Sequence, residues 1–362
     1  MTNLIFINGR FLGQPVTGVQ RYALELFRQM DLILQEANFK HLRLVCLAPR
    51  EVSVFPEWEK IEVRRVGFNQ GNLWEQVDLP LIAGGKLLFS PANTGPLFYS
   101  NQVITFHDAS VFAVPQAYTL PFRMKYQLIF QSLVRLAKAT LTDSHFSQRE
   151  LAHYLGVPAN HFSVILLGGD HLKAAPADNS ILQRHGLLPH QYILGVASQS
   201  IHKNFGRVLE AARQLEGDIQ FAVAGGSYGR VFQKSGEQSI PANVHTLGYI
   251  NDHELKALYE NAFAFIFPST YEGFGLPVLE AMSCGCPVLC SNAASLPEVA
   301  GEAALYFDPG DVDGMVALIK KLMADPELQT GLSRRGREQA DAFPWENTAR
   351  ATLAVLATCL VN

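Results

Sequence analysis

Charged residues and long hydrophobic runs are both scarce in this sequence. Charged residues make up 17% of the 362 positions and hydrophobic residues 48%, which is typical of a well-packed globular chain. No run of about eighteen apolar residues occurs, so no segment predicts a membrane-spanning helix. The start of the chain, MTNLIFINGRF, has no cationic segment, long apolar core or small-residue cleavage site. We therefore expect a soluble, cytoplasmic protein.

An excess of positive charge and paired cysteines are also missing. The formal net charge is -4 at pH 7, so no broad basic field indicates binding to nucleic acid. The five cysteines are odd in number and form no CxxC pair, which favours free thiols in the cytosol. Cys284 and Cys286 are close in sequence, but no histidine has a spacing suited to zinc. We expect no metal site and no cofactor.

Short apolar segments alternate with helical or polar segments along the chain, which predicts parallel sheets covered by helices. A polar, proline-bearing stretch at 170–190 separates two series of such segments. We expect an α/β protein with two doubly wound domains, at 1–172 and 188–343, facing a ligand-binding cleft. A further helix is expected in 344–362, after Pro344. The expected strands are 4–8, 42–48, 86–90, 103–106, 139–143 and 162–167 in the first series and 192–198, 219–225, 244–249, 263–269, 287–291 and 304–307 in the second.

The run YEGFGLPVLEAMSCGCPVL, at 271–289, places two glutamates in an apolar segment. Buried carboxylates are costly unless something pairs with them. The preceding strand, the permissive Gly273 and Gly275, and Pro277 together predict a strand, a tight loop and a helix start. Such a helix start presents free amides and a positive dipole end to an anion.

Glu272 on this loop and Glu280 about one turn into the helix can accept hydrogen bonds from hydroxyl groups on two sides of a bound phosphate. That arrangement suits a nucleotide sugar. The alternative is structural: Glu272 would be a solvated loop residue, and Glu280 would stabilise the helix N-terminus.

The segment STYEGFGLPVLEAMSCGCPV resembles the signature of the retaining glycosyltransferases of family 4, two glutamates separated by seven residues. The resemblance runs in order along nearly the whole chain. It implies the GT-B fold, with two Rossmann-like domains, a donor bound mainly by the second, and a C-terminal helix (344–362) that returns to the first. Other similar segments are TGVQRYALEL (17–26), NLWEQVDLPL (72–81), FSPANTGPL (89–97), TFHDASVF (105–112), TDSHFSQRELAHYLGV (142–157), HKNFGRVLEA (202–211) and ASLPEVAGEAALYFDP (294–309).

The resemblance also implies roles for individual residues. Glu280 would hold the ribose, Glu272 the transferred hexose, and Lys203 the diphosphate. Where many relatives carry an arginine, this chain has Ser198, so Arg230 is a candidate to add positive charge. The donor-binding residues implied are Gly18, Ser198, Lys203, Arg230, Ile250, Glu272, Gly273, Phe274, Gly275, Leu276 and Glu280.

His107, in the FHD segment, would contact the hexose near the reaction centre, which makes it the third expected catalytic residue beside Lys203 and Glu272. A lone histidine is otherwise more often structural, and Asp108 would orient the same loop. Gly18 would let an N-terminal loop approach the donor phosphates, or it would simply begin a helix.

The expected reaction is transfer of a hexosyl group with retention, without a metal, because lysine and helix amides replace the cation. GDP-mannose is the preferred donor, and dTDP-rhamnose or a UDP-hexose is the alternative. The expected acceptor is a glycan, a lipid-linked bacterial surface polysaccharide. A sugar-nucleotide 2-epimerase and a non-catalytic nucleotide-sugar-binding protein are the alternatives from other classes.

The segment 120–140 contains Arg123, Lys125, Arg135 and Lys138 beside aromatic residues. A helix of this kind could rest on an anionic membrane, placing the protein peripherally on the inner face of the cytoplasmic membrane. The alternative is an ordinary sheet-covering helix with solvated cations.

Overall fold

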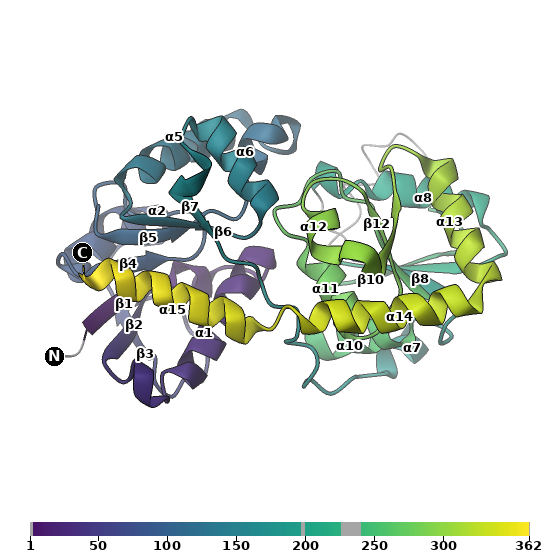
Figure 1. The fold of residues 1–362 in the computed structure, drawn as a ribbon, viewed down its shortest axis with the longest axis horizontal. Coiled ribbons are helices and arrows are strands. Elements are labelled where there is room, and N and C mark those ends of the chain that lie inside the picture. The colour runs from purple at the N-terminus through teal and green to yellow at the C-terminus, as the bar shows by residue number, and fades with distance from the viewer. Residues whose placement is uncertain (1–2, 197–199, 226–239, 362) are drawn as a thin grey trace. The chain divides into compact units, whose positions relative to one another are not determined.

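The chain forms two compact units in the computed structural model, which describes residues 3–196, 200–225 and 240–361 (Figure 1). The first unit comprises Met1–Leu167 and Trp345–Asn362, and the second comprises Gly168–Pro344. Each unit is built around one parallel β-sheet. The predicted α/β class with two doubly wound sheets is therefore confirmed.

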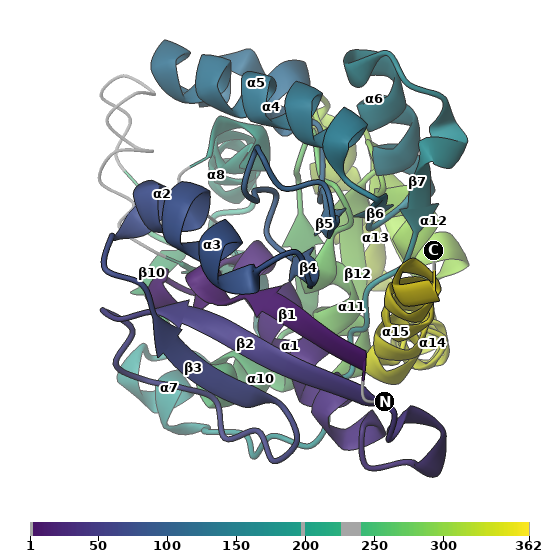
Figure 2. The ribbon, with the colours of Figure 1, turned by 90° about the vertical axis from the view of Figure 1, so that its left-hand side faces the viewer.

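The sheet of the first unit has seven strands in the order β3-β2-β1-β4-β5-β6-β7. Figure 2 shows β1, β2 and β3 side by side. The chain winds one way from β1 to β3 and the other way from β4 to β7, so the direction reverses between β1 and β4. The carboxyl ends of those two strands form the switch point at which such sheets bind ligands. The strands are β1 (Asn3–Asn8), β2 (Leu42–Pro49), β3 (Glu62–Val66), β4 (Leu87–Ser90), β5 (Gln102–Thr105), β6 (Ala139–Thr142) and β7 (Phe162–Val164).

Strand β3 was not among the expected strands. Its sequence, EVRRV, is charged and largely exposed, and Arg64 pairs with Glu62 within it. Charged side chains are a common protection for a sheet edge, and β3 is an edge strand. Because neither face of the strand is deeply buried, it has no apolar pattern to read from sequence.

Helices cover both faces of this first sheet. Helices α5 and α6 lie together and share an apolar core with β5 and β7 (Figure 2). A second core lies beneath η3 and α3. The helical segments are η1 (Gly9–Gly13), α1 (Gly18–Ile33), η2 (Ala37–Phe39), α2 (Gly71–Leu73), the π-helical η3 (Trp74–Asp78), α3 (Leu79–Ala83), α4 (Ser110–Ala113), η4 (Pro115–Ala117), α5 (Leu120–Leu136), α6 (His145–Leu155), η5 (Ala159–His161) and α15 (Trp345–Val361).

The last helix, α15, belongs to the first unit, as expected from the resemblance, and packs against α1 (Figure 1). Buried Trp345 lies near the ring of Tyr22. Thr348 Oγ1 donates to the carbonyl of Leu166 at 2.8 Å. The Arg350 guanidinium also pairs with Glu36, which follows α1. The C-terminal helix thus completes the core of the N-terminal domain.

The second unit has six parallel strands in the order β10-β9-β8-β11-β12-β13, with its switch point between β8 and β11. The stretch 170–190, which was expected to separate the two domains, includes α7 and belongs to this unit. The strands are β8 (Tyr192–Val196), β9 (Gln220–Ala224), β10 (Val244–Gly248), β11 (Ala264–Phe267), β12 (Val288–Ser291) and β13 (Ala304–Phe307). The helical segments are α7 (Ser180–Arg184), η6 (Ile201–Lys203), α8 (Phe205–Gln214), α10 (Asp252–Asn261), α11 (Leu276–Ser283), α12 (Leu296–Ala300), η7 (Gly301–Ala303), α13 (Val312–Ala324) and α14 (Pro326–Asp341).

Candidate functional site

The loop between β11 and α11 is held in one conformation. Gly275 has a φ of 102°, and a Cβ there would lie 2.5 Å from Cδ2 of Leu296. The backbone therefore favours glycine, and any larger residue would also have to displace the Leu296 side chain. The hydroxyl of Ser295 donates to the carbonyls of Glu272, at 3.0 Å, and of Phe274, at 2.8 Å. These contacts fix the loop that carries Glu272.

The amides at the start of α11 form an anion site. Within the described part of the chain, the amides of Phe274, Gly275 and Leu276 donate no hydrogen bond to the protein. Pro277 follows in the first turn and has no amide to satisfy. Gly273 is buried in the same loop. Amides at a helix N-terminus, backed by the helix dipole, favour a phosphate or diphosphate group.

Lys203 and Glu272 form an ion pair at the switch point of the second sheet. Nζ of Lys203 lies 2.7 Å from Oε1 of Glu272, and the side chains are 19% and 12% exposed. Lys203 ends η6. The next residue, Asn204, adopts a left-handed conformation, and its side-chain Nδ2 donates to the carbonyls of Pro268 and Pro309. The structure therefore brings together two of the three residues predicted to be catalytic.

Glu280 is buried, with its side chain 8% exposed, and both of its oxygens have protein neighbours. Tyr259 donates its hydroxyl to Oε2 at 3.2 Å, and Nε2 of His171 lies 3.2 Å from Oε1. Burial, together with the nearby carboxylate, raises the pKa of Tyr259 well above its usual range, so this hydroxyl stays protonated and keeps its donor role. Sequence analysis identified Glu280 but neither of these neighbours.

The other donor residues predicted in the second unit are less closely defined. Ile250 is half-buried just beyond the carboxyl end of β10, next to Tyr249, which is 80% exposed. Ser198 and Arg230 lie outside the described residues. The donor contacts proposed for these positions stay predictions.

His107 follows β5 in the first unit, and its buried ring is bonded at both nitrogens. Nδ1 lies 2.7 Å from Oδ2 of Asp143, and Nε2 lies 2.9 Å from the carbonyl of Pro91. A carbonyl only accepts, so Nε2 carries a proton, and a second proton lies between Nδ1 and Asp143. Burial alone would lower the pKa of His107, but the Asp143 carboxylate raises it overall. Burial raises the pKa of Asp143, in keeping with a shared proton.

The main chain of His107 is bonded as well. Its amide donates to Oδ1 of Asn93 at 2.8 Å, and its carbonyl accepts from the hydroxyl of Ser147 at 3.0 Å. Asp108 accepts from the amide of Ser110 and so orients the loop. For the ring of His107 to contact a hexose, it would have to exchange one of its partners. Its catalytic role stays a prediction.

Gly18 is exposed and is the first residue of α1, after the capping residue Thr17. A Cβ built at Gly18 meets no described atom within 4 Å. The helix itself therefore does not require glycine here, and the space beside it is open to a ligand. Whether donor phosphates approach this residue stays a prediction.

Comparison with known proteins identifies the family. Residues 181–339 match the family described as glycosyl transferases group 1. The O-antigen chain mannosyltransferase B of Escherichia coli is 32% identical over 370 residues, which cover 94% of this chain and 95% of that protein. The MMP alpha-(1->4)-mannosyltransferase of Mycolicibacterium hassiacum is 31% identical over 224 residues, which cover 59% of this chain and 53% of that protein. The chain belongs to the group 1 glycosyltransferases.

The fold agrees with this assignment. The solved structure of a sucrose-phosphate synthase from Thermosynechococcus elongatus matches with a TM-score of 0.78 over 100% of both chains, at 17% identity. The GT-B fold predicted from sequence is therefore confirmed. Among the described residues, no helix has the length and apolar character needed to cross a membrane, and no three His, Cys, Asp or Glu side chains are grouped as metal ligands. Independence from metal stays a prediction.

Proposed function

We propose that this protein transfers mannose from GDP-mannose, with retention of anomeric configuration, to the growing end of a lipid-linked bacterial surface polysaccharide. The observation that supports the proposal most strongly is the similarity, over nearly the whole chain, to an O-antigen chain mannosyltransferase. The Lys203–Glu272 pair beside the amides of α11 adds a chemical reason, since it suits a sugar diphosphate.

The donor would occupy the carboxyl edge of the second sheet. Lys203 and the free amides of Gly275 and Leu276 would bind the diphosphate. Lys203 would then exchange its ion pair with Glu272 for one with the diphosphate. Glu272 would then accept hydrogen bonds from the hexose. Glu280, oriented by Tyr259, would accept from the ribose, because each carboxylate oxygen has two lone pairs and can serve more than one donor.

The chemical step would take place on one face of the sugar. The bond from the anomeric carbon to the diphosphate oxygen breaks, and the bond from that carbon to the acceptor oxygen forms on the same side. The acceptor's proton passes to the departing diphosphate, so the products are the mannosylated acceptor and GDP. The protein stabilises the developing negative charge through fixed donors, which need no metal ion.

A donor screen followed by product analysis tests this proposal. We expect GDP-mannose to raise the melting temperature most among GDP, UDP, dTDP and their sugars, because a ligand that binds the native state stabilises it by mass action. With octyl mannosides as acceptors, we expect an α-linked product by NMR and an unchanged rate in EDTA. A preferred UDP- or dTDP-sugar, a β-linked product, epimerisation of the donor alone, or a rate lost in EDTA and restored by Mg²⁺ would each contradict a named part of the proposal.

Membrane contact through α5 is the second part of the proposal. Leu120, Met124 and Leu128 recur every fourth residue along the helix and are 57%, 60% and 62% exposed. Lys125 is exposed on the same helix and Lys138 just after its end, and residues 120–140 contain no acidic side chain. An exposed apolar stripe flanked by cations suits the surface of an anionic bilayer.

Co-sedimentation with vesicles tests this contact. We expect the protein to bind phosphatidylglycerol-containing vesicles and not pure phosphatidylcholine, and the K125E/K138E variant to bind at least about tenfold more weakly. The control is Lys320→Glu, which reverses the charge of an exposed lysine on α13 and should have little effect on vesicle binding. Equal binding by all three proteins would exclude α5 as the membrane surface.

A further inference from the structure

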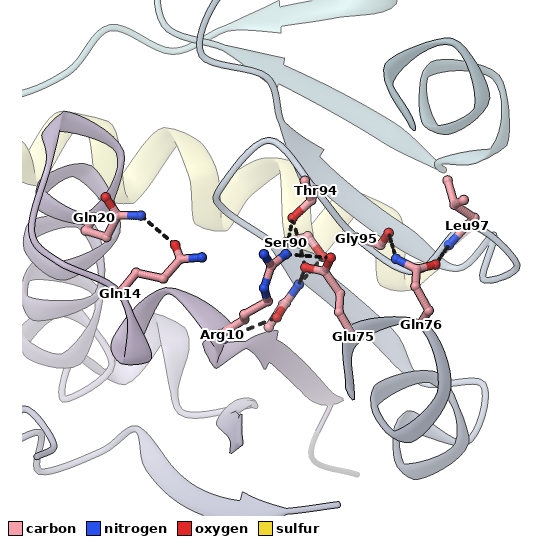
Figure 3. A network of polar contacts seen from close by, with 10 residues as sticks. Arg10, Gln14, Gln20, Glu75, Gln76, Ser90, Thr94, Gly95 and Leu97 are labelled. Carbon is pink, nitrogen blue, oxygen red and sulfur yellow. Dashed lines mark hydrogen bonds and ion pairs between the residues drawn. The ribbon is translucent and has the colours of Figure 1, made fainter. Parts of the chain in front are cut away.

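A polar cluster lies at the switch point of the first sheet (Figure 3). Asn8 ends β1 and Ser90 ends β4, and these two strands are neighbours. Arg10 lies on η1, Glu75 on the π-helical turn, and Thr94 on the loop after β4. Five segments, β1, η1, the π-helical turn, β4 and the loop after β4, therefore place polar side chains where an open α/β sheet receives its ligand.

Glu75 is the centre of this cluster and is 2% exposed. Its Oε1 accepts from Nδ2 of Asn8 at 2.8 Å and from the hydroxyl of Thr94 at 2.9 Å. Its Oε2 accepts from Nη1 of Arg10 at 2.9 Å. A buried carboxylate needs such partners to offset the loss of its hydration. Because Glu75 is almost fully buried and accepts from three other side chains, its role is to hold those side chains in place.

Arg10 is the residue of the cluster that has unused hydrogen-bond donors. Nη1 serves Glu75 and the hydroxyl of Thr94, which lies 3.1 Å away. Nε and Nη2 donate to no protein atom in the part of the chain that the structure describes. The side chain is 16% exposed. The guanidinium is thus fixed at one nitrogen, while three of its N–H groups stay available to a ligand.

The charge of the cluster indicates the kind of ligand. Glu75 neutralises Arg10, so the pair offers directional donors with little net positive charge. Such donors suit neutral hydroxyl groups better than a phosphate, for which an uncompensated cation would be favoured. Two adjacent hydroxyls of a sugar match the fork formed by Nε and Nη2.

The loop after β4 connects this cluster to His107. The carbonyl of Pro91 accepts from the His107 ring, and Oδ1 of Asn93 accepts from the His107 amide. Thr94, the next residue, bonds to Glu75 and Arg10. Asn93 has a φ of 62°, a conformation that non-glycine residues seldom adopt and that is often found at functional sites. A ligand at Arg10 would therefore lie near the histidine predicted to face the reaction centre.

We propose that Arg10, positioned by Glu75 and Thr94, binds two neighbouring hydroxyls of the acceptor sugar and thereby selects which glycan end is extended. This inference rests on the proposed function, because it requires a glycan acceptor. It gives a role to the segments NLWEQ and SPANT, which supply Glu75 and Thr94.

Acceptor kinetics test the role of Arg10. We expect Arg10→Lys to raise the KM for octyl mannoside acceptors about tenfold, while the dissociation constant of the donor and its slow hydrolysis by water stay unchanged. Glu75→Gln and Thr94→Val should raise the same KM to a smaller extent. The control is Arg28→Lys, on an exposed arginine that bonds Glu25 at 2.8 Å on α1, and it should behave like the wild type.

Deoxy acceptors distinguish direct contact from a structural effect. The wild type should lose about tenfold in kcat/KM when either contacted hydroxyl is removed, whereas Arg10→Lys should lose little more. If removal of a hydroxyl lowered kcat/KM by the same factor in Arg10→Lys as in the wild type, Arg10 would not contact that hydroxyl and the inference would be overturned. This comparison holds even if a variant is partly destabilised, because each protein is compared with itself across the acceptor series. If the wild type hydrolysed the donor but transferred to no mannoside, the inference about Arg10 would be overturned while donor binding would stand. Failure of the wild type to bind any nucleotide sugar would overturn the proposed function, and this inference with it.

Discussion

Replacement of Lys203 by alanine will lower the rate of transfer from GDP-mannose by about tenfold or more. A hydrogen bond to a charged group is worth about 1.5–3 kcal/mol, and about 1.4 kcal/mol corresponds to a factor of ten. In the proposed donor complex, the variant loses such a contact to the diphosphate. It also leaves Glu272, 12% exposed and 2.7 Å from the lysine, as an uncompensated negative charge in the site. Steady-state kcat/KM with saturating acceptor measures the effect.

A double-mutant cycle with Glu272 gives this prediction a control. The two side chains bond to each other, so we expect their effects on kcat/KM to be non-additive. The loss in the double variant should be smaller than the product of the losses in Lys203→Ala and Glu272→Ala. Lys320→Ala should have no effect, since this lysine is exposed on α13. Near wild-type kinetics in Lys203→Ala would remove the lysine from the mechanism.

Replacement of Glu280 by alanine will weaken the binding of GDP by about tenfold, whereas Glu272→Ala will chiefly lower turnover. The physical reason is position: Glu280 lies within α11, buried between Tyr259 and His171, while Glu272 lies on the loop with Lys203. Calorimetric titration with GDP and steady-state kinetics separate the two effects. GDP binding unchanged in a folded Glu280→Ala protein would contradict the assignment.

Two conservative variants control for folding in this experiment. Glu280→Gln keeps the volume and most of the packing, so it should retain the melting temperature better than alanine and still bind GDP more weakly. Tyr259→Phe removes the hydroxyl that donates to Oε2 but keeps the buried ring. We expect Tyr259→Phe to weaken GDP binding less than either Glu280 variant, because it removes one hydrogen bond that orients the Glu280 carboxylate but keeps the carboxylate itself.

Much of the fold could be predicted because buried strands appear in the sequence as short runs of apolar residues. All six strands expected in the first series form, since each contributes buried apolar residues to the sheet. The strand that escaped prediction, β3, is a charged edge. At the site, Gly275 and Pro277 predicted the loop and the helix start, because a positive φ and a missing amide are properties of single residues.

The partners of the site residues could not be predicted, because their distances along the chain are large. Glu280 bonds to Tyr259 across 21 residues, and His107 to Asp143 across 36. Nothing in LTDSH or ALYEN, the segments that contain Asp143 and Tyr259, distinguishes these partners from ordinary buried polar residues. Their roles arise from the order of neighbouring strands and helices, which periodicity does not specify.

The sequence by itself determined the fold class, the family and the loop that carries Glu272, since these depend on local backbone preference and on a contiguous motif. Only the tertiary structure decided what each charge meets. Lys203 reaches Glu272 across 69 residues, and Arg10 reaches Glu75 across 65. Both pairs form where a sheet reverses its winding, because the strand ends brought together at that point come from distant parts of the chain.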